Sequence, residues 1–305
     1  MKVFYQEAQN AFPSSYSPSA GKPKSVVAQW LTKWPELVIQ GFDPINAEDL
    51  YQIHARTYVD AVFSLCESNG FGTFDVDVNR SLLHTCGSFL AATRYALDTG
   101  DVAVSPTSGF HHAGYDHGGG FCTFNGLALA AKYVSNQGKR TAILDCDQHY
   151  GDGTDDILRS IALQGVKHFS MGEFYHQPRD AGDYLAKLVE LNDSHWLDGV
   201  DVLLYQAGAD CHVDDPLGGV LTTKQMRQRD LLVFSMAAAR RIPVVWNLAG
   251  GYQKPISKVV ELHSNTMAVC LSLYDGIEQR ATSQDQHDGQ AQGGLSACSE
   301  APPAA

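Results

Sequence analysis

The sequence lacks any long hydrophobic run. No stretch of its 305 residues approaches the ~18 consecutive apolar residues that a membrane-spanning helix needs. Residues 1–11 contain one lysine and no apolar core, so we expect no secretory signal peptide. These two absences lead us to expect a cytoplasmic protein that has no membrane partner.

Positive charge is scarce. The chain has 22 Lys and Arg against 34 Asp and Glu, which gives a formal net charge of −12. Such a balance argues against direct nucleic-acid binding, which needs a basic face, and against docking on anionic lipid. Since 44% of the residues are hydrophobic and only 18% are charged, most of the chain can form a packed core.

Paired cysteine motifs are also missing. The sequence has seven cysteines, an odd number, and none of them forms a Cys-x-x-Cys pair. This pattern is typical of reduced, mostly buried thiols in a cytoplasmic protein and indicates no cysteine-rich metal site.

Apolar runs and amphipathic stretches alternate along most of the chain. Helices are predicted first at residues 46–68 and 80–97, after a short strand at 2–5 and a loop at 10–24. Strands are then predicted at 102–104, 141–144, 166–169, 202–205 and 243–248, with helices at 122–135, 154–163, 183–196, 222–240 and 255–274. This alternation predicts an α/β fold with a central, mostly parallel sheet covered by helices on both faces.

The end of the chain differs in composition. From residue 279 onward it is rich in Gln, Ser, Gly, Ala and Pro. We therefore predict one domain over residues 1–278 and a disordered tail over residues 279–305.

Unusual polar residues follow four of the predicted strands. They lie in the segments 110–114, 145–153, 206–210 and 249–252. Since ligands bind beyond the carboxyl ends of the strands in open parallel sheets, the sequence predicts one site at that edge.

One of these segments has the character of a metal site. Asp145, Asp147 and His149 alternate, so on an extended segment their side chains would point to one face. Two carboxylates and an imidazole held together would repel one another unless a cation lay among them. Asp210, from another strand end, can add a carboxylate, and an Asp/His/Asp set with an open position is typical of catalytic zinc.

Two adjacent histidines form the second candidate. If Asp147, His149 and Asp210 hold a metal, His111 and His112 are free to transfer protons. A histidine in that role needs a carboxylate behind it, and Asp145 and Asp152 are the candidates.

Taken together, these segments resemble the histone deacetylase and acetylpolyamine amidohydrolase superfamily. The similarity covers roughly residues 1–275, and the motifs stand in the order of the family. They are His111-His112, Gly120-Phe121-Cys122, the segment 145–153, Gly208-Ala209-Asp210 with the segment 215–218, and Gly250-Gly251-Tyr252.

The resemblance implies a single arginase/deacetylase-like α/β domain over residues 1–278 and a role for each matched residue. It implies zinc ligands at Asp147, His149 and Asp210. It implies two proton-handling pairs, His111 with Asp145 and His112 with Asp152, and a transition-state tyrosine, Tyr252. A structural potassium (or sodium) ion would involve Asp145 and Ser170. A substrate tunnel would be lined by Gly120 and Phe121, by Phe174 or Tyr175, and by Leu217 at its base or rim.

Three positions depart from the family pattern. Tyr150 replaces a second histidine, Gly172 stands where many relatives carry a histidine, and Leu217 stands where polyamine-selective relatives carry a glutamate. None of these changes removes a catalytic residue, but each bears on tunnel shape and substrate choice.

The sequence thus predicts a zinc-dependent amidohydrolase that removes an acetyl or other acyl group from a primary amine. The expected substrate is acetyl-lysine, in a protein or a small molecule. An acetylpolyamine is the alternative substrate. An arginase-type dimanganese ureohydrolase and a non-catalytic acyl-lysine-binding protein are the less favoured alternatives.

Overall fold

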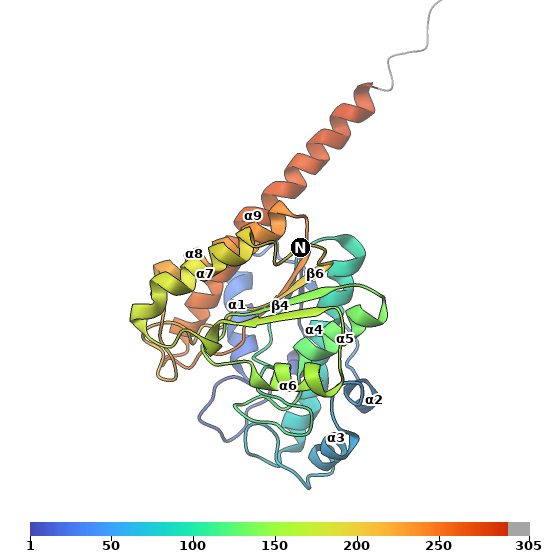
Figure 1. Ribbon diagram of the computed structural model, residues 1–305, viewed down its shortest axis with the longest axis vertical. Helices are drawn as coiled ribbons and strands as arrows, with labels where there is room; N and C mark the ends of the chain where they lie inside the picture. Colours follow the sequence, from blue (N-terminus) through green and yellow to red (C-terminus); the bar gives the residue numbers. More distant parts are fainter. Residues whose placement is uncertain (292–305) are drawn as a thin grey trace, which may run out of the picture.

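A single sheet of seven parallel strands forms the centre of the computed structural model, which describes residues 1–291 (Figure 1). The strand order is β2-β1-β3-β7-β6-β4-β5. The strands are β1 (Lys2–Phe4), β2 (Ile39–Gln40), β3 (Ala103–Ser105), β4 (Thr141–Asp145), β5 (Val166–Ser170), β6 (Val202–Gln206) and β7 (Val244–Asn247).

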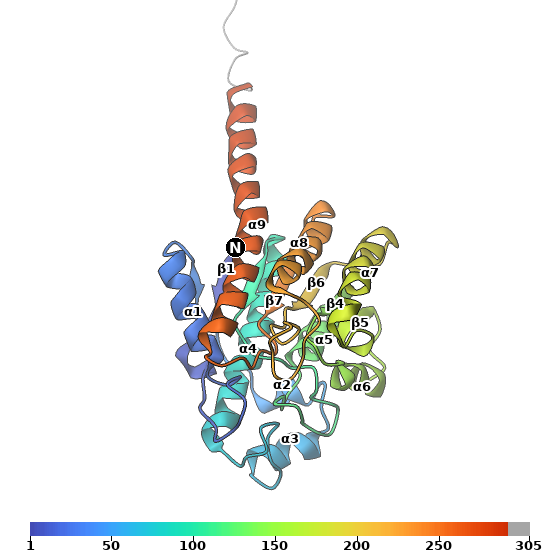
Figure 2. The same ribbon diagram turned by 90° about the vertical axis from the view of Figure 1, so that its left-hand side faces the viewer.

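Helices cover both faces of the sheet, as Figure 2 shows. Helices α1, α7, α8 and α9 lie on one face, and α4, α5 and α6 lie on the other. The helices are α1 (Lys22–Lys33), α2 (Ala47–Leu50), α3 (Arg56–Phe63), α4 (Val76–Thr99), α5 (Gly126–Asn136), α6 (Asp152–Ser160), α7 (Ala181–Asp193), α8 (Thr223–Ala239) and α9 (Ser257–Ala291). This is the predicted arginase/deacetylase-like α/β architecture.

The central strands are buried on both sides, which explains why they read as continuous apolar runs. Along β6, Leu203 and Tyr205 pack into one core cluster, while Val202 and Leu204 pack into the other. Every residue of β4 and β6 is buried. Side chains that alternate between two covered faces are the expected pattern for the inner strands of a parallel sheet.

Two predicted elements differ from the structure. The helix expected at 46–68 is divided into α2 and α3, because the chain turns at Tyr51–Ala55 and places the His54 ring against the carbonyl of Gly114. Helix α1 begins at Lys22, inside the segment predicted as loop, with Pro23 in its first turn, where a missing N–H costs nothing.

Helix α9 is the longest helix of the described chain and extends past the body (Figure 1). It continues to Ala291, so its last turns fall in the segment for which the sequence predicts disorder. Residues 292–305 lie outside the described residues, and the disordered tail stays a prediction. No helix in the described part of the chain has the length and apolar character to cross a membrane.

Candidate metal centre

Three side chains converge at the carboxyl ends of β4 and β6. Nδ1 of His149 lies 3.2 Å from Oδ1 of Asp147 and 3.3 Å from Oδ2 of Asp210. The three atoms lie within 4.8 Å of one another, and no other group of this kind occurs among the described residues. The sequence-predicted ligand set is therefore brought together from two different strands.

The local conformation of this segment differs from the prediction. Strand β4 ends at Asp145 and the chain bends through residues 147–149, so the extended segment with three side chains on one face is wrong. The Asp147 N–H donates to Oδ1 of Asp145 (3.0 Å), and the His149 N–H donates to Oδ1 of Asp147 (3.1 Å). Such side-chain-to-backbone bonds favour a turn over a strand. As a result, Asp145 faces His111 instead of the cluster.

Glycines let three chain segments close around the cluster. A Cβ on Gly250 would lie 2.0 Å from Oδ2 of Asp210, and one on Gly208 would lie 2.6 Å from Oδ1 of the same residue. The Gly250 N–H also donates to Oδ2 of Asp147 (2.8 Å). No side chain fits at either glycine, so the backbone itself forms the wall behind the carboxylates.

The electrostatics of the cluster favour a bound cation. Burial and the adjacent Asp147 raise the pKa of Asp210 to about 7. Burial alone would raise the pKa of Asp147, but His111 and His149 lower it well below its usual range. Contacts with Asp147 and Asp210 raise the pKa of His149 to about 11. The cluster thus attracts positive charge, whether a proton or a metal ion.

The residues fit a zinc ion. Oδ2 of Asp210 is buried, and no group in the described part of the chain donates a hydrogen bond to it. A buried carboxylate oxygen without a donor is costly unless a cation satisfies it. Two carboxylate oxygens and one imidazole nitrogen suit zinc, a metal of intermediate hardness, and leave a fourth coordination position for water.

Two histidine–aspartate pairs adjoin the cluster. In the inner pair, His111 Nδ1 lies 2.7 Å from Oδ2 of Asp145, and both side chains are buried. In the outer pair, His112 Nδ1 lies 2.8 Å from Oδ1 of Asp152, and the aspartate is largely exposed. The two imidazole centroids are 4.1 Å apart. The carboxylates predicted to stand behind each histidine are both in place.

The two pairs differ in charge preference. Burial alone would lower the pKa of His111, but the carboxylates of Asp145 and Asp147 outweigh burial and raise it to about 9. Burial lowers the pKa of His112, and the nearby His111 adds to this effect, while the bond to Asp152 opposes it. The inner histidine therefore favours the charged form, and the outer one the neutral form.

Tyr252 approaches the site from the loop after β7. Its N–H donates to Oδ2 of Asp215 (2.7 Å), and its ring lies 5.6 Å from that of Phe121. Burial, reinforced by Asp210 and Asp147, raises the pKa of Tyr252 well above that of a free phenol. Its hydroxyl therefore stays protonated and available as a hydrogen-bond donor.

A hollow of about 800 Å³ opens beside the cluster. Leu217 is among the residues that line it and is 40% exposed. Gly172 forms part of the wall with no side chain, since a Cβ there would lie 2.3 Å from the His149 carbonyl. The complete lining comprises His112, Gln148, His149, Tyr150, Asp152, Gly172, His176, Pro216, Leu217 and Gly218.

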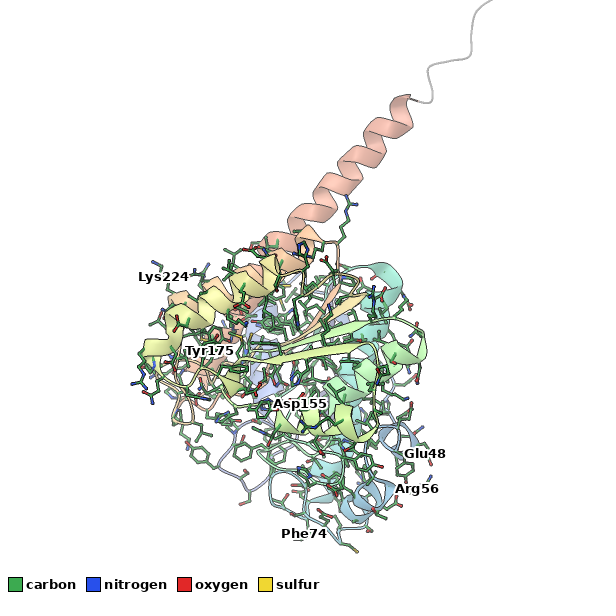
Figure 3. All side chains as sticks on the ribbon, in the orientation of Figure 1. Glu48, Arg56, Phe74, Asp155, Tyr175 and Lys224 are labelled. Atoms are coloured by element: carbon green, nitrogen blue, oxygen red, sulfur yellow. The ribbon has the colours of Figure 1, made fainter. Side chains whose placement is uncertain are left out.

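The predicted second aromatic wall is absent from this lining. Phe174 stacks on Phe169, with ring centroids 5.5 Å apart. Tyr175, which is labelled in Figure 3, packs against Tyr184 of α7. Tyr175 packs against the apolar cluster on the α7 face, and Phe174 is 53% exposed, so neither lines the hollow. His176, which the sequence gave no reason to select, takes that place.

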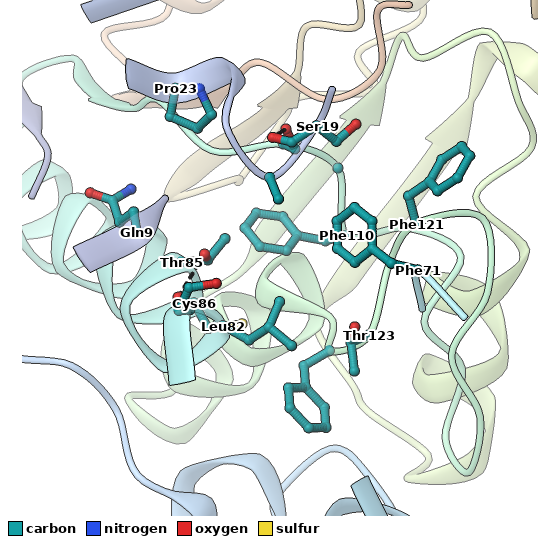
Figure 4. A pocket seen from close by; sticks show the side chains of 15 residues that line it. Gln9, Ser19, Pro23, Phe71, Leu82, Thr85, Cys86, Phe110, Phe121 and Thr123 are labelled. Atoms are coloured by element: carbon teal, nitrogen blue, oxygen red, sulfur yellow. Dashed lines mark hydrogen bonds between the residues drawn. The ribbon is translucent and has the colours of Figure 1, made fainter. Parts of the chain in front are cut away.

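Gly120 and Phe121 do not line this hollow but lie next to His112 and Tyr252 respectively. Gly120 has a φ of +52°, and a Cβ there would lie 2.4 Å from Cδ2 of His112, so only glycine fits. Phe121 also has a positive φ of +66° and contacts Phe71 as well as Tyr252. A second, largely apolar cavity lies on the far side of these rings and is lined by Phe71, Phe110 and Phe121 (Figure 4).

Asp145 and Ser170, predicted to hold a monovalent cation, are adjacent. They are partners in the ladder between β4 and β5. Oδ1 of Asp145 accepts a hydrogen bond from Gln206 (3.0 Å), and the Ser170 hydroxyl accepts one from the Gly151 N–H (3.0 Å). Their roles toward a cation remain a prediction.

Two buried residues of the site were assigned no role from the sequence. Lys22 is buried, and its ammonium donates to the carbonyl of Ala249, close to the tyrosine loop. Burial lowers the pKa of Lys22 to about 8, against the opposing effect of Asp210. His54 lies between Gly114 O, 2.7 Å from Nδ1, and the Asn125 N–H, which donates to Nε2 (3.0 Å). Only the folded chain brings these distant segments together.

The chain matches known proteins in sequence. The model of the histone deacetylase domain family matches residues 21–180. An uncharacterized protein of Picosynechococcus sp. is 34% identical over 206 residues, which cover 61% of this chain and 67% of that protein. Histone deacetylase 6 of Caenorhabditis elegans is 30% identical over 201 residues, covering 55% of this chain but 20% of that protein. The chain thus spans only part of the length of several relatives that it matches.

The fold matches solved structures as well. The acetylpolyamine aminohydrolase from Burkholderia pseudomallei superposes with a TM-score of 0.72 at 18% identity, covering 90% of this chain and 99% of that one. The HDA15 HD domain also gives a TM-score of 0.72, at 19% identity, covering 89% of this chain and 91% of that one. At these identities the likeness establishes the fold alone.

Proposed function

The chain belongs to the histone deacetylase domain family, and from this premise we propose that it is a zinc-dependent hydrolase of acetyl-lysine. The observation that carries the proposal is the cluster of Asp147, His149 and Asp210, in which a buried oxygen of Asp210 accepts no hydrogen bond from the described residues. The two histidine–aspartate pairs adjoin this cluster. We propose further that residues 1–278 form the deacetylase domain and that the protein is cytoplasmic.

The metal supplies only part of the chemistry. Zinc held by Asp147, His149 and Asp210 would polarise an amide carbonyl and lower the pKa of a bound water toward ~7. Breaking an amide also requires a group that accepts the proton of the attacking water and a group that protonates the leaving amine.

The outer pair is suited to both proton transfers. With Nδ1–H of His112 donating to Asp152, Nε2 is left to accept a proton from water and return it to the amine. The inner pair, His111 with Asp145, is buried and favours the charged form, so it supports developing negative charge electrostatically.

Tyr252 completes the site. Its protonated hydroxyl can donate a hydrogen bond to the substrate carbonyl oxygen as that oxygen gains negative charge. Such a bond strengthens toward the transition state and thus favours turnover more than substrate binding.

Two further assignments follow the same reasoning. We propose that Asp145 and Ser170 contribute to a structural potassium or sodium site beside the zinc. Gly120 and Phe121 on one side and Leu217 at the rim would contact the substrate. Of the residues that line the hollow, only Asp152 carries a carboxylate, and His112 already pairs with it. A neutral substrate terminus is therefore favoured over the cationic end of an acetylpolyamine.

Activity and metal content test this function together. The zinc-loaded protein should contain about one zinc per chain. It should hydrolyse an acetyl-lysine peptide at least as well as an acetylpolyamine. Asp210→Ala should lose both zinc and activity, whereas Asp214→Ala, an exposed carboxylate on the same loop, should retain both.

Other outcomes would replace the proposal. A hundredfold preference for the polyamine, about 2.7 kcal/mol in transition-state binding, would assign the alternative substrate. Urea release from arginine with two manganese ions would indicate a ureohydrolase. Tight zinc binding without turnover on any acylated amine would indicate a non-catalytic binding protein.

A further inference from the structure

A buried arginine lies behind the metal centre. Arg229, on α8, is the only arginine among the described residues that is buried, and its exposed fraction is 0%. It lines neither the hollow nor the cavity beside Phe121. Any contribution to the site must therefore act through the residues that it contacts, which include the Cys211 Sγ, 3.0 Å from Nη1, next to Asp210.

Its guanidinium joins two chain segments that carry metal ligands. Nη1 donates to the carbonyl of Gly208 (2.6 Å) and to the carbonyl of Cys146 (3.4 Å). Cys146 directly precedes the proposed ligand Asp147, and Gly208 lies two residues before Asp210. A single guanidinium nitrogen thus contacts the backbone of both segments.

This contact lies where the sheet no longer holds the two segments together. The pairing between β4 and β6 ends at Asp145 and Gln206, and the Cys146 N–H makes the last backbone–backbone bond, to the Gln206 carbonyl (2.9 Å). Beyond it, the Gln148 N–H donates to Oδ1 of Asp210 (3.1 Å). The ligands lie beyond that point, on bends. The guanidinium bridges the segments at the beginning of these bends.

A second set of contacts fixes the guanidinium plane. Nε and Nη2 of Arg229 lie 2.9 and 2.8 Å from Oδ1 of Asp230, which is also buried. That carboxylate accepts further bonds from the hydroxyl of Tyr205 on β6 (2.5 Å) and from that of Thr266 on α9 (2.7 Å). The carboxylate of this buried ion pair is thus shared among α8, α9 and β6, which compensates for part of the cost of burying the charges.

We propose that Arg229 is a positioning residue that sets the spacing between the ligands after β4, Asp147 and His149, and the ligand after β6, Asp210. The inference rests on the proposed zinc site. Arginine suits this role because one edge of its planar guanidinium can bond the Asp230 carboxylate while another edge bonds the carbonyls of Cys146 and Gly208. Lysine keeps the charge but offers a single point donor, so it cannot hold both at once.

Metal affinity measured by chelator competition tests the role directly. Arg229→Lys should weaken zinc binding roughly 10–100-fold, the usual effect of removing an outer partner of metal ligands. It should also shift the visible absorption bands of the cobalt-substituted protein, which report ligand geometry. Thr266→Val is the matched control, since it removes a bond to the same Asp230 but leaves both carbonyl contacts. It should change zinc affinity less than twofold and leave the cobalt spectrum unchanged.

A double variant separates positioning from stability. Arg229→Met with Asp230→Asn removes both buried charges, which avoids leaving one unpaired. If Arg229 positions the ligands, this protein should fold and still show the weakened zinc affinity and the altered cobalt spectrum. If either Arg229 variant folds, binds zinc within twofold of wild type and keeps the wild-type spectrum, Arg229 is only a core residue. Failure of the wild type to bind one zinc would instead overturn the proposed function.

Discussion

The two histidine–aspartate pairs have the same composition but different surroundings. In the inner pair, His111 and Asp145 are both buried, and His111 also lies 3.5 Å from the carboxylate of Asp147. In the outer pair, His112 is partly exposed in the hollow and pairs with a largely exposed Asp152. The surroundings move the histidine pKa values in opposite directions, upward for His111 and downward for His112.

The difference shows how adjacent identical residues can take different roles. A histidine held charged by buried carboxylates stabilises negative charge but is a poor base. A histidine kept neutral and open to solvent can accept a proton and release it again. We therefore assign the proton transfers to the outer pair and the electrostatic support to the inner pair.

Removal of the outer histidine is the strongest test of this comparison. His112→Ala should lower kcat by at least ~10²–10⁴-fold, the usual contribution of general acid–base catalysis, because no other neutral imidazole has its position. Zinc content should stay near wild type, because His112 is not in the ligand cluster. His111→Ala is the matched variant and should lower kcat less. Near-normal turnover of His112→Ala would transfer the base role to His111.

Tyr252 tests whether electrostatic support comes from the inner pair alone. Tyr252→Phe keeps the ring that contacts Phe121 and removes only the hydroxyl. Loss of one donor to a developing oxyanion should lower kcat by ~10²–10³-fold, with KM little changed. Steady-state kinetics on a zinc-loaded sample, with zinc content measured alongside, would check this. A kcat within threefold of wild type would leave Tyr252 as a wall of the site.

His54 extends the comparison to a buried histidine with no carboxylate partner. Burial lowers its pKa to about 4, although the Gly114 carbonyl opposes this. The unfolded chain, with a histidine pKa near ~6.5, then binds the proton first as pH falls. The neutral, buried ring of His54 therefore contributes fully to the stability of the fold above pH ~6.5, and this contribution is lost as pH falls toward 4. Between pH 7 and 5 the loss should reach about 2 kcal/mol of unfolding free energy.

Urea unfolding at pH 7 and pH 5 would measure this effect. His54→Gln should be less stable than wild type at pH 7, because one of the two ring hydrogen bonds is lost. Its stability should depend less on pH over this interval than that of the wild type. Equal pH dependence in the two proteins would mean that His54 is not the group responsible.

Most helices and strands could be predicted from the local sequence pattern, but several of their boundaries could not. The runs at 141–144 and 202–205 are strands within one residue of the prediction, because a strand buried on both faces must be apolar throughout. The helix predicted at 46–68 is divided, because the turn at Tyr51–Ala55 is stabilised by a contact between His54 and Gly114, 60 residues apart. Hydrophobic periodicity gives no information about such a contact.

In the site, too, local sequence predicted some features, and contacts between distant segments decided others. The sequence placed Asp147, His149 and Asp210 at neighbouring strand ends, and the structure brings their ligand atoms within 4.8 Å. It could not place Phe174 or Tyr175, because both rings pack against aromatic partners and neither lines the hollow. It gave no indication of Arg229, whose backbone partners lie in the loops after β4 and β6.

The sequence by itself determined which chemical groups gather at one edge of the sheet. The succession of strands and helices, the residue types and the positions of glycines are properties of the chain, and they suffice to specify four carboxylates, three imidazoles and a phenol. Only the tertiary structure decided how each group behaves. Burial and neighbouring charge depend on segments far apart in the sequence, and they set the protonation free energy of each group. Two adjacent histidines of identical chemistry thereby differ, since the surroundings of His111 favour the charged form and those of His112 the neutral form.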